Sequence, residues 1–96
     1  MNYDFEWDPD KARANRRKHG VGFEDATTVF KDSRALSVYD DAHSAAEERW
    51  ITLGFAATGA LLAVHHTFIE LDADTVVIRI FSCRRATRRE ISSYTE

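Results

Sequence analysis

The residues in this sequence best suited to chemistry are cations gathered in two blocks far apart along the chain. Residues 11–19 carry five lysine and arginine side chains and no acid, and residues 79–89 carry five arginines and no acid. Ten of the thirteen basic side chains are arginine. A guanidinium group binds phosphate oxygens through two parallel hydrogen bonds, which an ammonium group cannot do. The two blocks therefore favour recognition of phosphate groups.

The remainder of the chain is acidic, and the net charge is −3. Two basic blocks on an acidic background can form a local surface for a polyanion without a basic isoelectric point. The alternative is that each block is simply a solvated face of a helix, because runs of charge usually face water. Composition leaves both interpretations open.

The histidine and cysteine residues give weaker evidence for catalysis or metal binding. His19 ends the first basic block, and an imidazole with an ordinary pKa of about 6.5 suits general acid–base catalysis of phosphodiester cleavage. Alternatively, it hydrogen-bonds the last carbonyls of a helix. His65 and His66 are adjacent in a predicted strand, so they point to opposite faces and cannot chelate a metal together. We expect no metal site and no cofactor, and an inert thiol at Cys83, since no motif frames it as a nucleophile.

Two helices and a strand must position the first basic block. Alternating aromatic and acidic residues over 3–7 predict a short strand. Asp8 before Pro9 is a helix start, and Gly20 is a stop, so a helix is expected over 9–19. Apolar residues at helical spacing predict a second helix over 23–30. Three side chains spaced i, i+4 and i+7 share one face of the first helix: Lys11, Asn15 and Lys18.

Strands and a last helix position the second block. Apolar alternation predicts strands over 36–39, 49–55, 61–71 and 75–82, with short connections that favour antiparallel hairpins. Thr87 and Glu90 match a capping box that begins a C-terminal helix. The expected order is β-α-α-β-β-β-β-α. This order predicts an α+β fold in which the helices pack on one side of a small antiparallel sheet.

Length and composition limit the remaining possibilities. Ninety-six residues, 44% of them hydrophobic, are expected to form a single domain over 1–96. No apolar run approaches the roughly 20 residues that span a bilayer, and no secretory signal is visible at the N-terminus. One cysteine excludes an internal disulfide and suits a reducing compartment. We expect a cytoplasmic protein that does not bind membranes.

Most of the candidate residues belong to two motifs, one at each end of the chain. The N-terminal motif comprises Trp7-Asp8, Lys11, Asn15, Lys18-His19-Gly20, Phe23, Ala26 and Phe30, and the C-terminal motif comprises residues 79–90 and Tyr94. These motifs resemble those of the BrnT toxins. The middle of the chain also fits this family, through Glu48-Arg49-Trp50 and Gly54, so the resemblance covers nearly the whole chain. Cys83 departs from the family motif, which usually has a small residue such as alanine at this position.

The resemblance implies a RelE-like fold and the toxin of a type II toxin–antitoxin system, a ribonuclease that cleaves RNA and inhibits translation. It also implies a BrnA-type antitoxin whose ribbon-helix-helix part binds DNA. We expect DNA contact only through that antitoxin, because the chain shows no helix-turn-helix or zinc-finger pattern. The alternative function is a non-catalytic module that binds the antitoxin and acts only as a co-repressor.

An RNA strand that is cleaved by its own 2′-hydroxyl, without a metal ion, needs a proton acceptor, a proton donor and cations at the developing charge. We predict that three arginines of the second block clamp the phosphate, with Arg49 in support: Arg79, Arg84 and Arg85. Lys18 or His19 is expected near the scissile group. Lys11 and Arg88 are expected to bind RNA.

Overall fold

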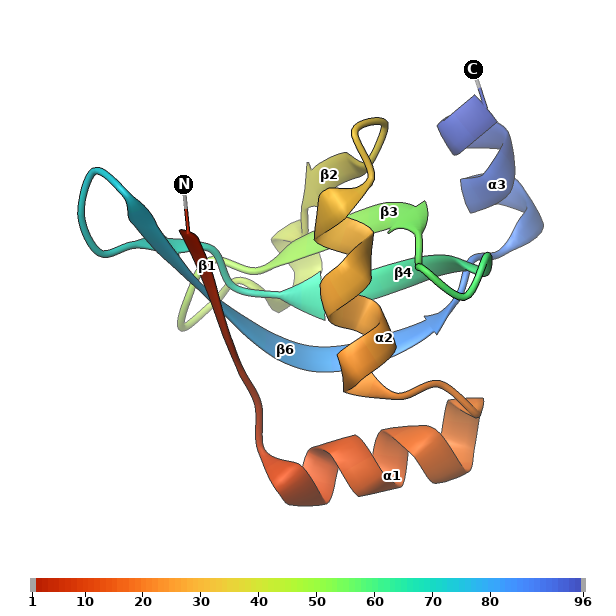
Figure 1. The fold of residues 1–96 in the computed structure, drawn as a ribbon, viewed down its shortest axis with the longest axis horizontal. Coiled ribbons are helices and arrows are strands. Elements are labelled where there is room, and N and C mark those ends of the chain that lie inside the picture. Colours follow the sequence, from red (N-terminus) through yellow and green to blue (C-terminus); the bar gives the residue numbers. More distant parts are fainter. Residues whose placement is uncertain (1, 96) are drawn as a thin grey trace.

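The computed structural model describes residues 2–95, which form one mixed sheet with three helices (Figure 1). The strands are β1 (Asn2–Glu6), β2 (Leu36–Tyr39), β3 (Trp50–Phe55), β4 (Leu61–His66), β5 (Ile69–Glu70) and β6 (Thr75–Arg85). The helices are α1 (Pro9–His19), α2 (Phe23–Thr28) and α3 (Arg88–Thr95), with 3-10 turns η1 (Val29–Lys31) and η2 (Asp41–His43). The predicted α+β class is confirmed.

The sheet has the strand order β1-β6-β4-β3-β2, and β5 pairs with β6. The pairs β2–β3, β3–β4 and β4–β6 are antiparallel, as predicted. β1 differs, because it runs parallel to β6, with Asn2 opposite Thr75 and Glu6 opposite Arg79. The prediction of a wholly antiparallel sheet was wrong for this pair. Short hairpins determine the direction only of strands that follow one another, and β1 and β6 are the first and last strands.

The predicted strand over 61–71 is divided. β4 ends at His66, and β5 begins at Ile69 and pairs with a different part of β6. The register between β4 and β6 shifts between His65 and His66, so that one residue of β6, Phe81, has no counterpart in β4. Such a β-bulge bends the strand and changes the direction of the side chains beside it.

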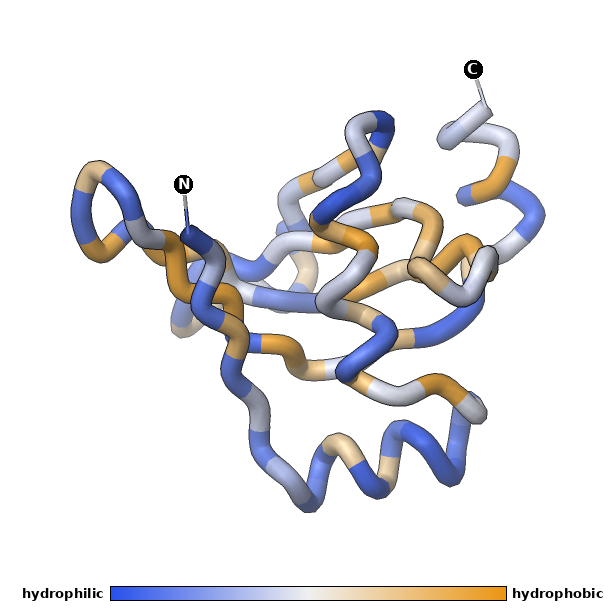
Figure 2. The backbone as a smooth tube through the Cα atoms, in the orientation of Figure 1, coloured by the Kyte–Doolittle hydropathy of each residue, from blue (hydrophilic) through white to orange (hydrophobic). Residues whose placement is uncertain are grey.

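The hydrophobic core lies between α2 and one face of the sheet. Phe23, Ala26 and Val29 are fully buried there, together with apolar side chains of β4 and β6 such as Val64 and Ile78. α1 is mostly hydrophilic (Figure 2) and lies along β6, near the edge of the sheet. α3 lies at one end of the sheet (Figure 1). The sequence predicts that all the helices pack on one side of the sheet, and this prediction was wrong. α2 contributes fully buried apolar side chains to the core, whereas α1 contributes only the half-buried Ala12.

The helix ends predicted at Asp8, Gly20 and Thr87 are confirmed, whereas the second helix ends at Thr28, before the predicted residue 30, and the 3-10 turn η1 follows it. The carboxylate of Asp8 accepts a hydrogen bond from the backbone N–H of Asp10 at 2.8 Å, and Gly20 ends α1 with a left-handed φ of 70°. Thr87 and Glu90 form the reciprocal capping box, in which each side chain accepts a hydrogen bond from the other residue's backbone N–H. These caps determine where α1 leaves β1 and where α3 leaves β6.

Candidate active site

The face of the sheet opposite α2 carries the candidate site. Ala63 and His65 of β4 alternate with the buried Val64, and their partners on β6 are Arg84 and Ser82. Because cross-strand partners share a face, these side chains lie on the side away from the core. We call this side, with His65, Phe81, Ser82 and Arg84, the open face.

His66 points the other way, as predicted. It is 1% exposed, and both ring nitrogens are hydrogen-bonded, Nε2 to the hydroxyl of Thr52 at 2.6 Å and Nδ1 to the carbonyl of Thr67 at 2.8 Å. Burial lowers its pKa. His66 is therefore a neutral core residue, and the two adjacent histidines have separate environments.

Two shallow pockets flank Phe81 and Ser82 on the open face. The first, of about 240 Å³, is lined by Lys11, Lys18 and His19 of α1. The second, of about 330 Å³, is lined by four side chains from the β2–β3 region and β4. Phe81 and Ser82 line both pockets, because the bulge turns two successive β6 side chains to the same side. The four other side chains of the second pocket are Asp40, His43, Arg49 and His65.

Phe81 contacts a cation from each side of the site. The Nζ atom of Lys11 lies 5.7 Å from the centre of the ring, and the guanidinium carbon of Arg49 lies 4.1 Å from it. Both distances fit cation–π contacts. Lys11 and Arg49, which are far apart in the sequence, therefore meet at Phe81, but no arginine of the second block lines either pocket.

Asn15 holds α1 against the site. β1 pairs with β6 only as far as Arg79, and farther along this edge the Asn15 side chain takes the place of a strand. Its amide nitrogen donates to the carbonyl of Cys83 at 2.8 Å, and its amide oxygen accepts from the Cys83 N–H at 3.1 Å. Asn15 also donates to the carbonyl of Val21 and is 7% exposed. One buried side chain thus fixes the distance between α1 and β6.

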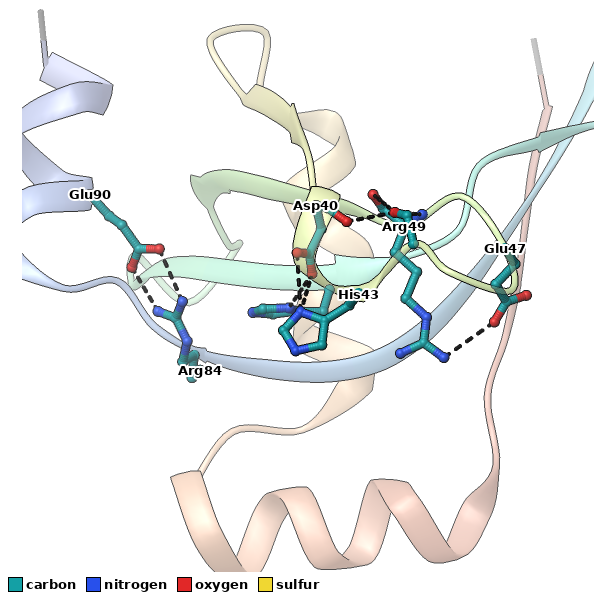
Figure 3. A network of polar contacts seen from close by, with 8 residues as sticks. Asp40, His43, Glu47, Arg49, Arg84 and Glu90 are labelled. Atoms are coloured by element: carbon teal, nitrogen blue, oxygen red, sulfur yellow. Dashed lines mark hydrogen bonds and ion pairs between the residues drawn. The ribbon is translucent and has the colours of Figure 1, made fainter.

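A buried carboxylate organises the second pocket. Asp40 is 8% exposed, and its two oxygens lie 2.9 and 3.1 Å from Nδ1 of His43. Nδ1 of His65 lies 3.9 Å from the same carboxylate. The backbone N–H of Asp40 donates to the carbonyl of Arg49 at 2.7 Å, which closes the loop between β2 and β3. Figure 3 shows the Asp40–His43 pair on the same side of β6 as Arg49 and Arg84.

The imidazole of His65 is favoured in its neutral form. Burial is the main cause that lowers its pKa, and the positive charge of Arg84 acts in the same direction. The carboxylates of Asp40 and Glu90 oppose this shift without cancelling it. A neutral imidazole can accept a proton near neutral pH.

Arg84 borders this region but is already paired. Its guanidinium group donates to both carboxylate oxygens of Glu90, at 2.7 and 3.0 Å. The hydrogen bond with Arg84 is the main reason that the pKa of Glu90 falls to about 2. The same carboxylate caps α3 through the backbone N–H of Thr87. Arg84 therefore joins β6 to the start of α3.

Three other predicted arginines, Arg79, Arg85 and Arg88, lie outside the two pockets. Arg79 is exposed, with Nη1 3.5 Å from a carboxylate oxygen of Glu6. Arg85 ends β6 and Arg88 begins α3, and both are exposed. Arg49 lines the second pocket with its Nη2 group 3.3 Å from Glu47. Of the eight predicted residues, the structure brings four together around Phe81 and Ser82: Lys11, Lys18, His19 and Arg49.

The sequence did not reveal the roles of Asp40, His43 and His65. The adjacency of His65 and His66 in the sequence bears only on joint metal binding, and Asp40 and His43 lie in a loop without regular periodicity. Within residues 2–95, no group of three or more His, Cys, Asp or Glu side chains is placed to hold a metal ion. Cys83 is fully buried, and burial raises the pKa of its thiol to about 12, so it is unreactive as expected.

A family model matches residues 7–90, which include both pockets. It describes the ribonuclease toxin BrnT of type II toxin–antitoxin systems. The chain belongs to the BrnT toxin family. This membership agrees with the resemblance in the N- and C-terminal motifs, and a type II system implies an antitoxin protein as partner of the BrnT chain.

A solved structure supports the same fold. The ribonuclease toxin BrnT of Brucella abortus matches with a TM-score of 0.64 and 20% sequence identity, over 92% of this chain and 100% of that chain. At this identity the likeness concerns the fold alone. Comparison with curated protein sequences finds no match. Among the described residues of this BrnT-family chain, no helix is long and apolar enough to cross a membrane.

Proposed function

We propose that this protein is an endoribonuclease that cleaves RNA through the strand's own 2′-hydroxyl group, without a metal ion or cofactor. One observation carries the proposal: cations from residues 11–19 and from Arg49 meet at Phe81 and Ser82 on one open face. An aromatic ring flanked by cations suits single-stranded RNA, whose phosphates bind cations and whose bases stack on aromatic side chains.

In the proposed complex, Lys11 and Lys18 bind phosphates along α1, and Arg49 binds the scissile phosphate from the other side of Phe81. Preorganised cations stabilise the charge that develops on the phosphate, which is usually the largest contribution to such catalysis. His19 lies beside Lys18 in the first pocket and remains a candidate for proton transfer.

Four of the predicted arginines keep a role in this proposal at the border of the site. Arg84 lies close enough to His65 to affect its pKa, but Glu90 offsets part of its charge. Arg79 shares the outward side of β6 with Phe81, two residues away. Arg85 and Arg88 are proposed to contact phosphates farther along the RNA. The clamp formed by Arg79, Arg84 and Arg85 stays a prediction.

The antitoxin is proposed to be of the BrnA type, with a ribbon-helix-helix part that contacts DNA. This proposal follows from membership in a type II toxin family together with the sequence resemblance. Operator DNA should then bind the complex of the two proteins and not the isolated toxin. A gel-shift assay with toxin, antitoxin and both together tests this point.

The experiment that tests the ribonuclease is incubation of the purified protein with end-labelled RNA in the presence of EDTA. We expect discrete fragments that end in a 2′,3′-cyclic phosphate, and a marked loss of cleavage in R49A. A parallel incubation with translating ribosomes tests whether cleavage requires them. If neither incubation yields fragments, the proposal is wrong and the non-catalytic, antitoxin-binding module is favoured.

A further inference from the structure

We infer that His65 and His43, held by the buried carboxylate of Asp40, form the proton-transfer site for RNA cleavage. This inference rests on the proposed function and deepens it. His65 accepts the proton of the 2′-hydroxyl group, and His43 gives a proton to the leaving 5′-oxygen. Asp40 is a positioning residue, because its carboxylate is hydrogen-bonded to His43 and lies 3.9 Å from Nδ1 of His65.

The geometry places both rings around one carboxylate at the edge of a pocket. Nδ1 of His43 lies 2.9 Å from an oxygen of Asp40, and Nδ1 of His65 lies 3.9 Å from the same oxygen. In both rings the nitrogen near the carboxylate is Nδ1, so Nε2 is on the opposite side of the ring and serves as the reactive atom. Arg49, which lines the same pocket, supplies the positive charge beside them.

A comparison with His66 separates this arrangement from ordinary packing. His66 is buried, and hydrogen bonds to Thr52 and Thr67 occupy both of its ring nitrogens, which is the pattern of a structural histidine. His65 and His43 both line a pocket that opens to solvent. Two imidazoles sharing a buried carboxylate next to a phosphate-binding arginine fit acid–base chemistry better than packing.

The reaction balances without a co-reactant. His65 takes the proton from the 2′-hydroxyl group, and the 2′-oxygen forms a bond to phosphorus while the bond from phosphorus to the 5′-oxygen breaks. His43 donates its proton to that 5′-oxygen. The products are a 2′,3′-cyclic phosphate and a 5′-hydroxyl group. Solvent then returns the two imidazoles to their starting protonation states.

The surroundings of each ring determine its role. Arg84 of β6, Glu90 of α3, Asp40 at the end of β2 and His43 of η2 are the charged or titratable groups that act on His65. Burial and Arg84 prevail, and the pKa of His65 lies below the ordinary value. A neutral ring is the form that a base requires. His43 lies in direct contact with the carboxylate, which orients its ring for donation.

The test compares H65Q, H43Q and D40N with D41N, a control that removes the neighbouring exposed carboxylate of the same turn. We expect kcat to fall about 100-fold in H65Q and H43Q and about 10-fold in D40N, with D41N unchanged. The rise of kcat/KM with pH should disappear in H65Q.

A second substrate assigns the two roles. In RNA with sulfur in place of the bridging 5′-oxygen, the thiolate leaves without a proton, so an acid is not needed. This substrate should restore cleavage by H43Q to within about threefold of the wild type, while H65Q stays impaired. Rescue of H65Q instead of H43Q would overturn the assignment of roles.

The outcomes distinguish this inference from the proposed function. If the wild type cleaves RNA and all three variants retain its rate and pH profile, the inference fails and the ribonuclease stands. The inference also fails, and the ribonuclease stands, if the pH dependence of kcat/KM changes in H19Q and in none of the three variants. If the wild type does not cleave RNA, both fail. Circular dichroism checks folding, and the exposed His43 provides the variant least able to disturb it.

Discussion

The two basic blocks have the same number of cations and similar charge, but the fold uses them differently. In the block over 11–19, Lys11 and Lys18 line a pocket, and the salt bridges of the described residues do not involve them. In the block over 79–89, Arg84 is bound to Glu90, and Arg79 lies near Glu6. Arg13 and Arg16 of the first block are also paired, with Asp10 and Glu24, so each block has two cations in ion pairs. The difference is that the first block also places two lysines at a pocket beside Phe81, whereas no arginine of the second block lines either of the two pockets there.

This contrast shows that the local charge of a sequence does not indicate whether a cation is available to bind a phosphate group. An arginine that is hydrogen-bonded to a carboxylate has lost part of its attraction for phosphate, while a lysine beside an aromatic ring retains it. Four predictions, from the largest expected effect to the smallest, test the difference between the blocks.

Separating α1 from β6 should have the largest effect. In N15A, the N–H and C=O groups of Cys83 lose their buried partner, so we expect the free energy of unfolding to fall by about 3 kcal/mol. Urea denaturation measures this loss. R17A, an exposed change on the same helix, should remain within about 0.5 kcal/mol of the wild type. A loss in N15A no greater than in R17A would show that Asn15 does not hold the helix.

Removing the available cations should impair activity and not stability. In K11A/K18A we expect kcat/KM for RNA cleavage to fall about 100-fold, equivalent to roughly 2.7 kcal/mol, because two phosphate contacts are lost. The free energy of unfolding should change by less than about 0.5 kcal/mol, since both side chains are exposed. Full activity in the double variant would mean that the first pocket does not bind the substrate.

Removing the carboxylate that pairs with Arg84 should reduce the stability of the fold. E90Q should lose about 1 kcal/mol of stability near pH 7, a modest value because solvent screens this partly exposed pair. The folded-state pKa of Glu90, about 2, lies below the ordinary value. Its contribution is therefore present above the unfolded pKa and is lost as pH falls towards 2. Urea denaturation across this pH range should show the wild type and E90Q converging.

The smallest effect is expected at the exposed start of α3. R88A should weaken RNA binding by about threefold and reduce its salt dependence by about one counterion, with no measurable loss of stability. Fluorescence anisotropy at several salt concentrations measures both quantities. A loss as large as that of K11A/K18A would place the main RNA contacts at the second block and reverse the comparison.

Much of the fold could be predicted because its signals are local. The caps at Asp8, Gly20 and Thr87 lie within a few residues of the groups that they bind, and the strand periodicity extends over single elements. The parallel pairing of β1 with β6 could not be predicted, because it joins residues more than seventy positions apart. The capping box of Thr87 and Glu90 was predicted correctly. The hydrogen bond from Arg84 to Glu90 could not be predicted, because it depends on how β6 meets α3.

The sequence by itself determined most of the elements, the two basic blocks and the opposite orientation of His65 and His66, since each follows from spacing along one segment. The division of the strand predicted over 61–71 into β4 and β5 did not follow from spacing. Only the tertiary structure decided which cations face a pocket and which are paired. It also placed Asp40, His43 and His65 together. The physical reason is that these contacts depend on strand pairing and on the bulge at Phe81, which set distances between side chains of different strands.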